Sequence, residues 1–299
     1  MKISLVGAGA IGSLWAGALA KQGHQLHLWR RQPGNTYTLN WQDVHSSRED
    51  TFFFDSNQPA QLADSDVVFI TVKAFQVADA VTTLLPWLSA DTPVIIMHNG
   101  MGTEDEVLSL LPDNPVLYAT TAQAAFRPDP HSVRHTGNGP TYLGGVNPAG
   151  QACSGLAELL HTALPPCHWQ TDIHEPQWQK LAINCAINPL TAIHQCRNGE
   201  LSETRYADEL TAVCHEVSAV MTAAGYPIDT VTLRQRVMKV IEATAANYSS
   251  MQQDVAHQRP TEIDAITGFL IRQANHFQIA TPANTRLWQH IKDLEQHYD

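Results

Sequence analysis

The sequence predicts an α/β fold: a Rossmann-type doubly wound sheet domain followed by an all-helical C-terminal domain. Short apolar runs alternate with helical patterns in the first half, a glycine motif follows the first run, and strand-like runs stop near residue 174. Strands separated by helices of roughly 10–15 residues indicate parallel βαβ units. We therefore expect a Rossmann-type domain over residues 1–171 and a helical domain over residues 172–299.

Five short apolar runs are expected to form the parallel strands of the first domain: Ile3–Val6, Leu26–Trp29, Val67–Val72, Val94–Met97 and Val116–Thr121. The Gly-rich stretch around 132–143 is expected to add antiparallel strands at the sheet edge. Apolar residues at helical spacing predict helices near 74–88, 175–194, 203–224, 229–246, 261–276 and 284–297. Thr261 is the expected N-cap of the 261–276 helix.

The composition is that of a soluble globular protein, with 43% hydrophobic and 16% charged residues. The formal charge of -11 disfavours nucleic acid and anionic membranes as partners. An anionic ligand would therefore need a local cluster of cations. Size and composition leave a monomer and a homodimer both open.

The cysteines and histidines predict neither disulfides nor a metal site. The five cysteines are odd in number and form no C-x-x-C pair, and the 15 histidines form no metal-binding motif. The apolar run at the N-terminus ends at Gly7, so it reads as a strand rather than a signal peptide. With no apolar run long enough for a membrane span, we expect a cytoplasmic protein.

The glycine motif predicts a dinucleotide site. It lies between the first strand and the first helix and comprises Gly7, Ala8, Gly9, Ala10, Ile11 and Gly12. In this context the first glycine permits a tight turn, the second lets a pyrophosphate approach the backbone, and the third allows close helix–strand packing. The helix N-terminus offers free N–H groups to the phosphates.

The residues after the second strand favour NADPH as the cofactor. An NAD enzyme usually places an acid there to bind the ribose 2′-hydroxyl, whereas this chain has Arg30 and Arg31. A guanidinium binds a 2′-phosphate through charge-assisted hydrogen bonds. The alternative is a pair of solvated surface arginines.

Two further loops follow strand ends on the side where doubly wound folds bind ligands. Lys73 and Gln76 follow the third predicted strand, and Asn99 lies between the fourth strand and Gly100. Lys73 could equally be a solvated strand cap. Asn99 is the more specific candidate, because its amide can donate and accept.

A polar face on one helix supplies the candidate catalytic residues. Lys180, Asn184 and Asn188 stand at i, i+4 and i+8, so they line one face. Asn is a poor helix former, which indicates a role beyond stability, although a plain solvent face remains the alternative. Pro189 is expected to kink or end the helix.

The chain resembles the ketopantoate reductase family over nearly its whole length. The resemblance rests on GAGAIG, the arginine after the second strand, KAFQ at 73–76, HNGMG at 98–102, WQKLAINCAINPLTAI at 178–193, CRNGE at 196–200, NYSSM at 247–251 and TEID at 261–264. It departs from many relatives at Thr267, where they have Asn, and at Arg30, which adds a second cation. The order and spacing of the shared motifs along the chain are together highly specific.

The resemblance implies an NADPH-dependent reduction of 2-dehydropantoate to (R)-pantoate in pantothenate biosynthesis. Lys180 would be the proton donor, and Glu262 would lie where substrate and nicotinamide meet. Further substrate contacts would come from Asn99, Asn184, Asn188, Asn198, Asn247, Ser249 and Ser250. Besides the glycine motif, cofactor contacts would come from Arg31, Lys73, Gln76, Asn99, Ala125 and Glu262.

Two other functions stay open from the sequence. One is reduction of a different small 2-keto acid by the same chemistry. The other is a non-catalytic NADP-binding regulator, which would be expected to have lost Lys180 or Glu262.

Overall fold

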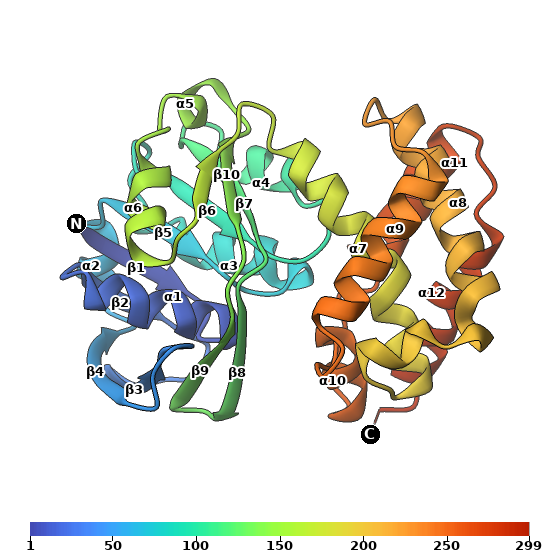
Figure 1. Cartoon of the computed structure of the whole chain (residues 1–299). Coiled ribbons are helices and arrows are strands. Elements are labelled where there is room, and N and C mark those ends of the chain that lie inside the picture. The colour runs from blue at the N-terminus through green and yellow to red at the C-terminus, as the bar shows by residue number, and fades with distance from the viewer. Residues whose placement is uncertain (299) are drawn as a thin grey trace. The chain divides into compact units, whose positions relative to one another are not determined.

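The computed structural model describes residues 1–298 (Figure 1). The chain forms two compact units. The first unit comprises Met1–His98 and Thr103–Ile173, and the second comprises Asn99–Gly102 and the chain from His174 onward. The loop Asn99–Gly102 thus packs with the helical unit although its neighbours in sequence belong to the sheet unit.

The first unit is built on an eleven-stranded sheet with the order β11-β10-β7-β6-β5-β1-β2-β4-β3-β9-β8. The strands are β1 (Lys2–Val6), β2 (Gln25–Trp29), β3 (Thr36–Gln42), β4 (Glu49–Ser56), β5 (Val67–Ile70), β6 (Val94–Met97), β7 (Val116–Thr121), β8 (Ala124–Asp129), β9 (Ser132–Gly137), β10 (Thr141–Gly145) and β11 (Cys167–Trp169). Strands β7, β6, β5, β1, β2 and β4 run parallel. The predicted Rossmann-type sheet is confirmed.

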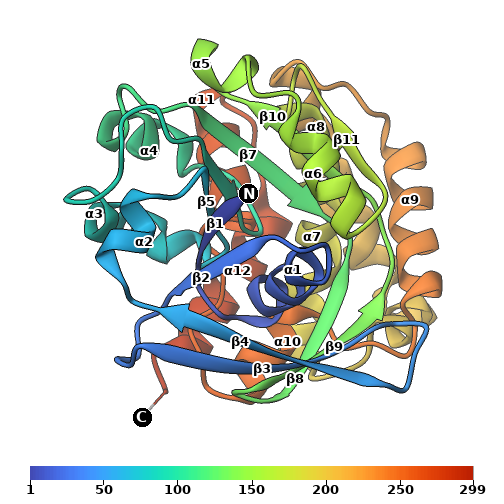
Figure 2. The ribbon, with the colours of Figure 1, turned by 90° about the vertical axis from the view of Figure 1, so that its left-hand side faces the viewer.

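Helices cover both faces of this parallel region (Figure 2). Because successive strand residues point to opposite faces, Val67 and Phe69 pack in one apolar core and Val68 and Ile70 in another. The first core includes helices α1 (Ala10–Lys21) and α6 (Leu156–Ala163), and the second includes α2 (Pro59–Ala63), α3 (Val77–Leu84) and α4 (Glu104–Leu110). A 3-10 turn, η1 (Ala74–Gln76), precedes α3, and the short α5 (Pro148–Gln151) follows β10.

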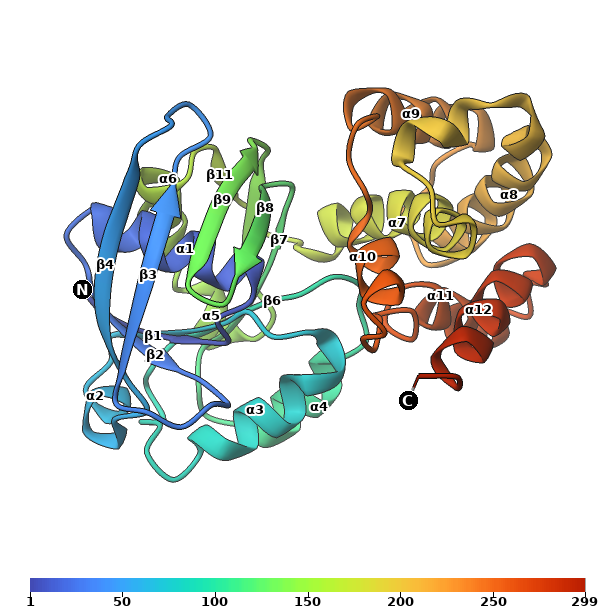
Figure 3. The same ribbon diagram turned by 90° about the horizontal axis from the view of Figure 1, so that it is seen from below.

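Additional strands extend the sheet on both sides of the parallel region. Strand β9 pairs antiparallel with β8 at one edge, and β10 pairs antiparallel with β7 near the other, so β9 and β10 are the antiparallel strands expected around residues 132–143. Strands β4, β3, β9 and β8 lie side by side (Figure 3). Strands β3 and β4 were not predicted, because their polar residues dilute the apolar signal of a strand.

The second unit is all-helical, as predicted, and centres on α7. Its helices are α7 (His174–His194), α8 (Ala207–Ala223), α9 (Thr230–Ala243), α10 (Ser250–Ala256), α11 (Thr267–His276) and α12 (Pro282–Glu295), with 3-10 turns η2 (Asn198–Ser202) and η3 (Thr204–Tyr206). Trp178, Leu181 and Cys185 of α7 lie in its apolar core. None of the helices in the described chain has the length and apolar content of a membrane span.

Two expectations about this unit are wrong. The helix expected to start at residue 261 begins at Thr267, and Thr261 enters an irregular loop instead of capping a helix. The alternative that Pro189 ends its helix is also wrong, because α7 continues to His194. Leu190 and Ala192, which follow the proline, are fully buried, so core packing outweighs the hydrogen bond that a proline removes.

Candidate active site

The glycine loop of the first unit has the geometry that its sequence predicts. Gly7 has a φ of +95°, and its N–H donates to the carbonyl of Trp29 at 3.0 Å. A Cβ on Gly12 would lie 2.1 Å from the Gly7 oxygen, so only glycine fits there. A Cβ on Gly9 would meet nothing within 4 Å. The loop is closely packed at Gly12, whereas the space beside Gly9 is open, which fits a site for a phosphate group.

The helix α1 supplies the expected N–H groups. Gly9 is its N-cap, and its first intrahelical bond runs from Ser13 N–H to the Gly9 oxygen at 2.9 Å. The N–H groups of Ala10, Ile11 and Gly12 thus precede the hydrogen-bond ladder. The first turn carries no acidic residue that would repel an anion.

Arg30 and Arg31 emerge beside this loop, because β1 and β2 are paired in parallel up to Val6 and Trp29. Their environments differ. The Arg30 guanidinium donates to the Thr36 carbonyl at 3.3 Å and to Ser56 Oγ at 3.2 Å. Arg31 is exposed. Since Arg30 is engaged by its own unit, Arg31 is the better candidate for an external phosphate.

Lys73 and Gln76 follow β5, the neighbour of β1 on its other side. Thr71 Oγ1 donates to the Gly7 carbonyl at 3.0 Å, which joins this segment to the glycine loop. The Gln76 side chain accepts a hydrogen bond from Lys73 N–H at 3.3 Å, and the Lys73 ammonium lies 5.9 Å from the ring centroid of Phe75. The structure therefore places both residues in the turn that leaves the strand next to the loop.

Ala125 lies on β8, and a residue of the same strand reaches the glycine loop. The Arg127 guanidinium donates to the carbonyls of Ala8 and Pro130. Sequence reasoning missed Arg127. The signal available was its position two residues after Ala125, because alternate residues of a strand share a face.

In the second unit, Asn99 and Glu262 are held together. The Glu262 carboxylate accepts from the side-chain amide of Asn99 at 2.9 Å and from its backbone N–H at 3.3 Å. The neighbouring residues fix the loop, since Met101 N–H donates to the Ala265 carbonyl at 2.8 Å. Glu262 is buried, with 8% of its surface exposed. A carboxylate so placed needs polar partners, and Asn99 is one.

Lys180 on α7 is the third member of this cluster. Burial lowers the pKa of Lys180 to about 8, and the Glu262 charge partly offsets the loss of hydration. An ammonium with a pKa near neutrality is suited to donate a proton. The structure thus brings Lys180, Glu262 and Asn99 together although 163 positions separate the latter two along the chain.

The remaining candidates of α7 stay in register with Lys180, because the helix is continuous from His174 to His194. Asn188 is buried with 7% of its surface exposed, and Asn184 is half-buried. The polar face is therefore not a freely solvated face.

Asn198 has an unused acceptor. Its side-chain nitrogen donates to Thr244 Oγ1 at 2.9 Å, and its backbone N–H donates to the Asn247 carbonyl at 2.9 Å. Among the described residues, nothing donates to Asn198 Oδ1, although this atom is buried. A buried acceptor without a donor is costly, so the atom is suited to a ligand hydroxyl.

Ser249 and Ser250 differ in what their side chains do. Ser249 is buried and caps α10, where its hydroxyl accepts from Gln252 N–H at 3.0 Å and lies 2.7 Å from Thr191 Oγ1. Ser250 is exposed at the first position of that helix, and Asn247 is exposed in the preceding loop. The Ser249 side chain therefore anchors the segment, whereas Ser250 and Asn247 are accessible.

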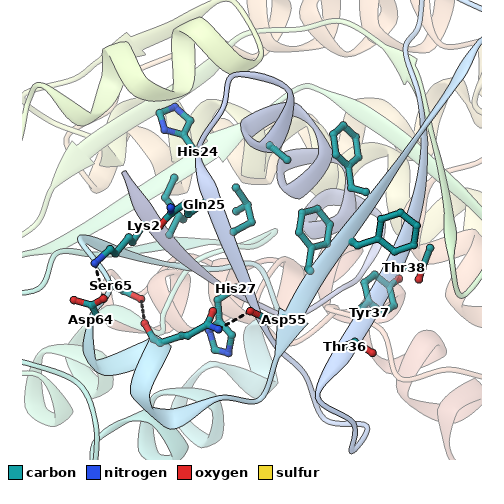
Figure 4. A pocket seen from close by; sticks show the side chains of 17 residues that line it. Lys2, His24, Gln25, His27, Thr36, Tyr37, Thr38, Asp55, Asp64 and Ser65 are labelled. Atoms are coloured by element: carbon teal, nitrogen blue, oxygen red, sulfur yellow. Dashed lines mark hydrogen bonds and ion pairs between the residues drawn. The ribbon is translucent and has the colours of Figure 1, made fainter.

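One surface pocket of the first unit lies away from the glycine loop (Figure 4). It is lined at the amino ends of β1 and β2 by Lys2, Gln25 and His27. Ligands of open α/β sheets bind at the carboxyl ends of the strands, which is where the glycine loop lies. We therefore do not assign this pocket to the dinucleotide. Within residues 1–298, no His, Cys, Asp and Glu group is arranged to hold a metal ion.

Comparison with known proteins agrees with these features. Residues 3–148 match the family model described as ketopantoate reductase PanE/ApbA, and residues 172–295 match its C-terminal counterpart. A 2-dehydropantoate 2-reductase of Vibrio cholerae is 45% identical over 298 residues, covering 100% of this chain and 99% of the relative. One from Escherichia coli O157:H7 is 43% identical, covering 100% and 97%.

Solved structures of similar proteins share the fold. A PanE/ApbA family ketopantoate reductase from Ralstonia eutropha has a TM-score of 0.88 at 27% identity and covers 99% of both chains. A D-mandelate dehydrogenase solved with NADH and anilino(oxo)acetate has a TM-score of 0.88 at 23% identity, covers 99% of both chains, and supports the fold alone. By both family models and the full-length relatives, this chain belongs to the ketopantoate reductase PanE/ApbA family.

Proposed function

We propose that this protein reduces 2-dehydropantoate to (R)-pantoate with NADPH, using Lys180 as the proton donor. The observation that carries the proposal is the cluster of Lys180, Glu262 and Asn99, in which burial lowers the pKa of the lysine to about 8. Membership of the family and the names of its full-length relatives support the substrate.

The cofactor proposal rests on the sheet unit. Bound NADPH would supply a hydride to the ketone carbon. The N–H groups at the start of α1 and the close backbone approach at Gly9 fit a pyrophosphate. Arg31 is exposed beside the loop, where an NAD enzyme would carry an acid. Lys73, Gln76 and Ala125 are the further cofactor contacts proposed in this unit, and Asn99 and Glu262 are those proposed in the helical unit.

Lys180 would complete the reduction by neutralising the oxygen of the substrate. As the ketone carbon is reduced, negative charge builds on its oxygen. The Lys180 ammonium stabilises that charge and transfers one proton to the oxygen, which gives the hydroxyl of the product and leaves a neutral lysine. The Glu262 carboxylate favours the ammonium form before the transfer.

The asparagines and serines would bind the other groups of the substrate. Asn184 and Asn188 can donate and accept through their amides, and Asn198 Oδ1 is a buried acceptor that a substrate hydroxyl would satisfy. Ser250 and Asn247 would bind the carboxylate, with Ser249 fixing their segment. A pocket built for a hydroxyl rejects analogues that lack it, so activity on simpler 2-keto acids should be weak.

The test is a spectrophotometric assay of NADPH oxidation with 2-dehydropantoate beside a panel of 2-keto acids. We expect 2-dehydropantoate to be the preferred substrate. Lys180→Ala should lower kcat by roughly 10²–10⁴, the usual range for a positioned acid, while NADPH binding followed by fluorescence persists. A panel member that outcompetes 2-dehydropantoate would show reduction of another 2-keto acid. NADPH binding without turnover of any substrate would show a regulator.

A further inference from the structure

Arg127 connects strand β8 to the glycine loop. Its guanidinium donates to the backbone carbonyls of Ala8 and Pro130. Arg127 is half-buried, and its Nε is buried without a hydrogen-bond partner among the described residues. The Arg127 side chain is thus held at the glycine loop although it belongs to β8, the edge strand of the sheet.

The carbonyl that Arg127 binds belongs to the peptide linking Ala8 to Gly9. In a trans peptide the C=O and N–H point in opposite directions. Holding the Ala8 oxygen therefore fixes the direction of the Gly9 N–H and the path of the chain into α1. Ser13 Oγ also donates to this oxygen, at 3.3 Å, but it lies inside α1 and cannot tie the loop to the rest of the sheet.

The second carbonyl that Arg127 binds, that of Pro130, is itself held in place. The Pro130 oxygen also accepts from the Tyr37 hydroxyl, and the ring of Tyr37 lies 4.6 Å from the Arg30 guanidinium. A continuous set of contacts therefore runs from the end of β2 to the glycine loop. A planar guanidinium can bind two acceptors at once in a fixed geometry, whereas a lysine ammonium acts as a point charge.

We propose that Arg127 is a positioning residue for the cofactor: it holds the Ala8–Gly9 peptide so that the loop and the start of α1 present their N–H groups to the pyrophosphate. This inference rests on the proposed NADPH-dependent function. It concerns the part of the cofactor that NADPH and NADH share, so Arg127 should affect both equally, unlike Arg31.

The test compares Arg127→Gln and Arg127→Lys with Arg134→Gln, an exposed arginine of the adjacent strand β9 whose change removes the same charge. We expect Arg127→Gln to raise the Kd and KM for NADPH and for NADH by about tenfold, the scale of a charge-assisted contact. The kcat at saturating cofactor should stay within about twofold of the unmodified enzyme, since the loop is not at the reacting end. Arg127→Lys should be nearly as weak, because a lysine cannot span both carbonyls.

Several outcomes would overturn the inference. Arg127→Gln behaving like Arg134→Gln would show that the loop needs no such anchor. Normal affinity in Arg127→Lys would show that only the charge matters. A fall in kcat and thermal stability without a change in Kd would indicate a general structural role. Failure of the unmodified protein to bind NADPH would instead overturn the proposed function, so the two failures can be told apart.

Discussion

At the scale of single residues, the protonation of Lys180 is set by two opposing effects. Loss of hydration lowers its pKa, and the charge of Glu262 raises it, with the first effect the larger. As the proposed proton donor, Lys180 must be in its ammonium form, so the reductive rate should fall as the pH rises through about 8. A pH profile of kcat/KM for 2-dehydropantoate measures this fall in rate, which is the alkaline limb of the profile.

Glu262→Gln should move that limb to lower pH, because it removes the negative charge that raises the Lys180 pKa. The variant should also lose affinity for substrate or cofactor, since the Asn99 contact is altered. Asp208→Asn, which changes an exposed carboxylate of α8, is the matched control. A limb that moves upward, or stays in place, would contradict this account of the site.

Arg31 and Arg30 should contribute unequally to cofactor choice. NADPH should exceed NADH by well over tenfold in kcat/KM, because a charge-assisted contact contributes ~1.5–3 kcal/mol. Arg31→Asp should weaken or reverse that preference. Arg30→Gln should have a smaller effect, since its guanidinium is engaged by Thr36 and Ser56. Equal use of the two cofactors by the unmodified enzyme would refute the assignment.

At the scale of elements, two glycines of the glycine loop have different roles: Gly12 allows close packing, and Gly9 leaves room for a ligand. Gly12→Ala should destabilise the fold and impair binding, because its Cβ would lie 2.1 Å from the Gly7 oxygen and 2.4 Å from Thr71 Oγ1. Gly9→Ala should leave the unfolding free energy within about 0.5 kcal/mol yet weaken NADPH binding, because its Cβ points into open space. Denaturant unfolding and fluorescence titration measure the two effects. Equal losses of unfolding free energy in Gly12→Ala and Gly9→Ala would contradict this difference between the two glycines.

The loop that carries Glu262 shows where a helical pattern misleads. Ile263, Ile266, Leu270 and Ala274 are all buried, as their spacing predicts. However, the helix begins only at Thr267, because Thr261 donates through both its N–H and its hydroxyl to Glu295 Oε1 at 2.7 Å. These bonds come from α12, which no local pattern could reveal.

The same limit applies to the loop Asn99–Gly102. Gly100 allows a close backbone approach there, since a Cβ on it would lie 2.3 Å from the Ala265 oxygen. Its neighbours in sequence placed it with the sheet, whereas its contacts are with the helical unit. Burial of Met101 in the helical core accounts for this assignment.

At the scale of the whole molecule, the cofactor and catalytic candidates divide between two units. The glycine loop and Arg31 belong to the first unit, and Lys180 and Glu262 belong to the second. The proposed hydride transfer requires the reacting atoms to come within roughly 3–3.5 Å. Cofactor and substrate should therefore bind cooperatively, and by linkage each should tighten the other by the same factor. Calorimetry of substrate with and without NADP⁺ measures the coupling, and equal affinities would exclude it.

The stability of the molecule should depend on the charge of His27. Gln58 N–H donates to His27 Nε2 at 2.9 Å, and His27 Nδ1 lies 2.8 Å from Ser4 Oγ. The ring is therefore neutral with its proton on Nδ1. Burial lowers the His27 pKa to about 4.

Because the folded pKa of His27 lies below the unfolded value, its protonation opposes folding. Stability should be full above pH ~6.5 and fall as the pH drops toward about 4. The loss from this group is about 3 kcal/mol. His27→Gln cannot titrate, so its deficit in unfolding free energy relative to the unmodified protein should shrink between pH 7 and pH 5. A deficit that is constant with pH would contradict the assignment.

The sequence by itself determined the parallel strands β1, β2, β5, β6 and β7, the glycine loop, the helical second unit and the register of Lys180, Asn184 and Asn188. These features depend on spacing along a short stretch of chain, where periodicity and backbone sterics act directly. Only the tertiary structure decided which groups meet: Glu262 with Asn99, Arg127 with Ala8, Ser249 with Thr191. Such contacts join residues tens to more than a hundred positions apart. Their formation depends on the packing of whole elements, which no local pattern in the chain encodes.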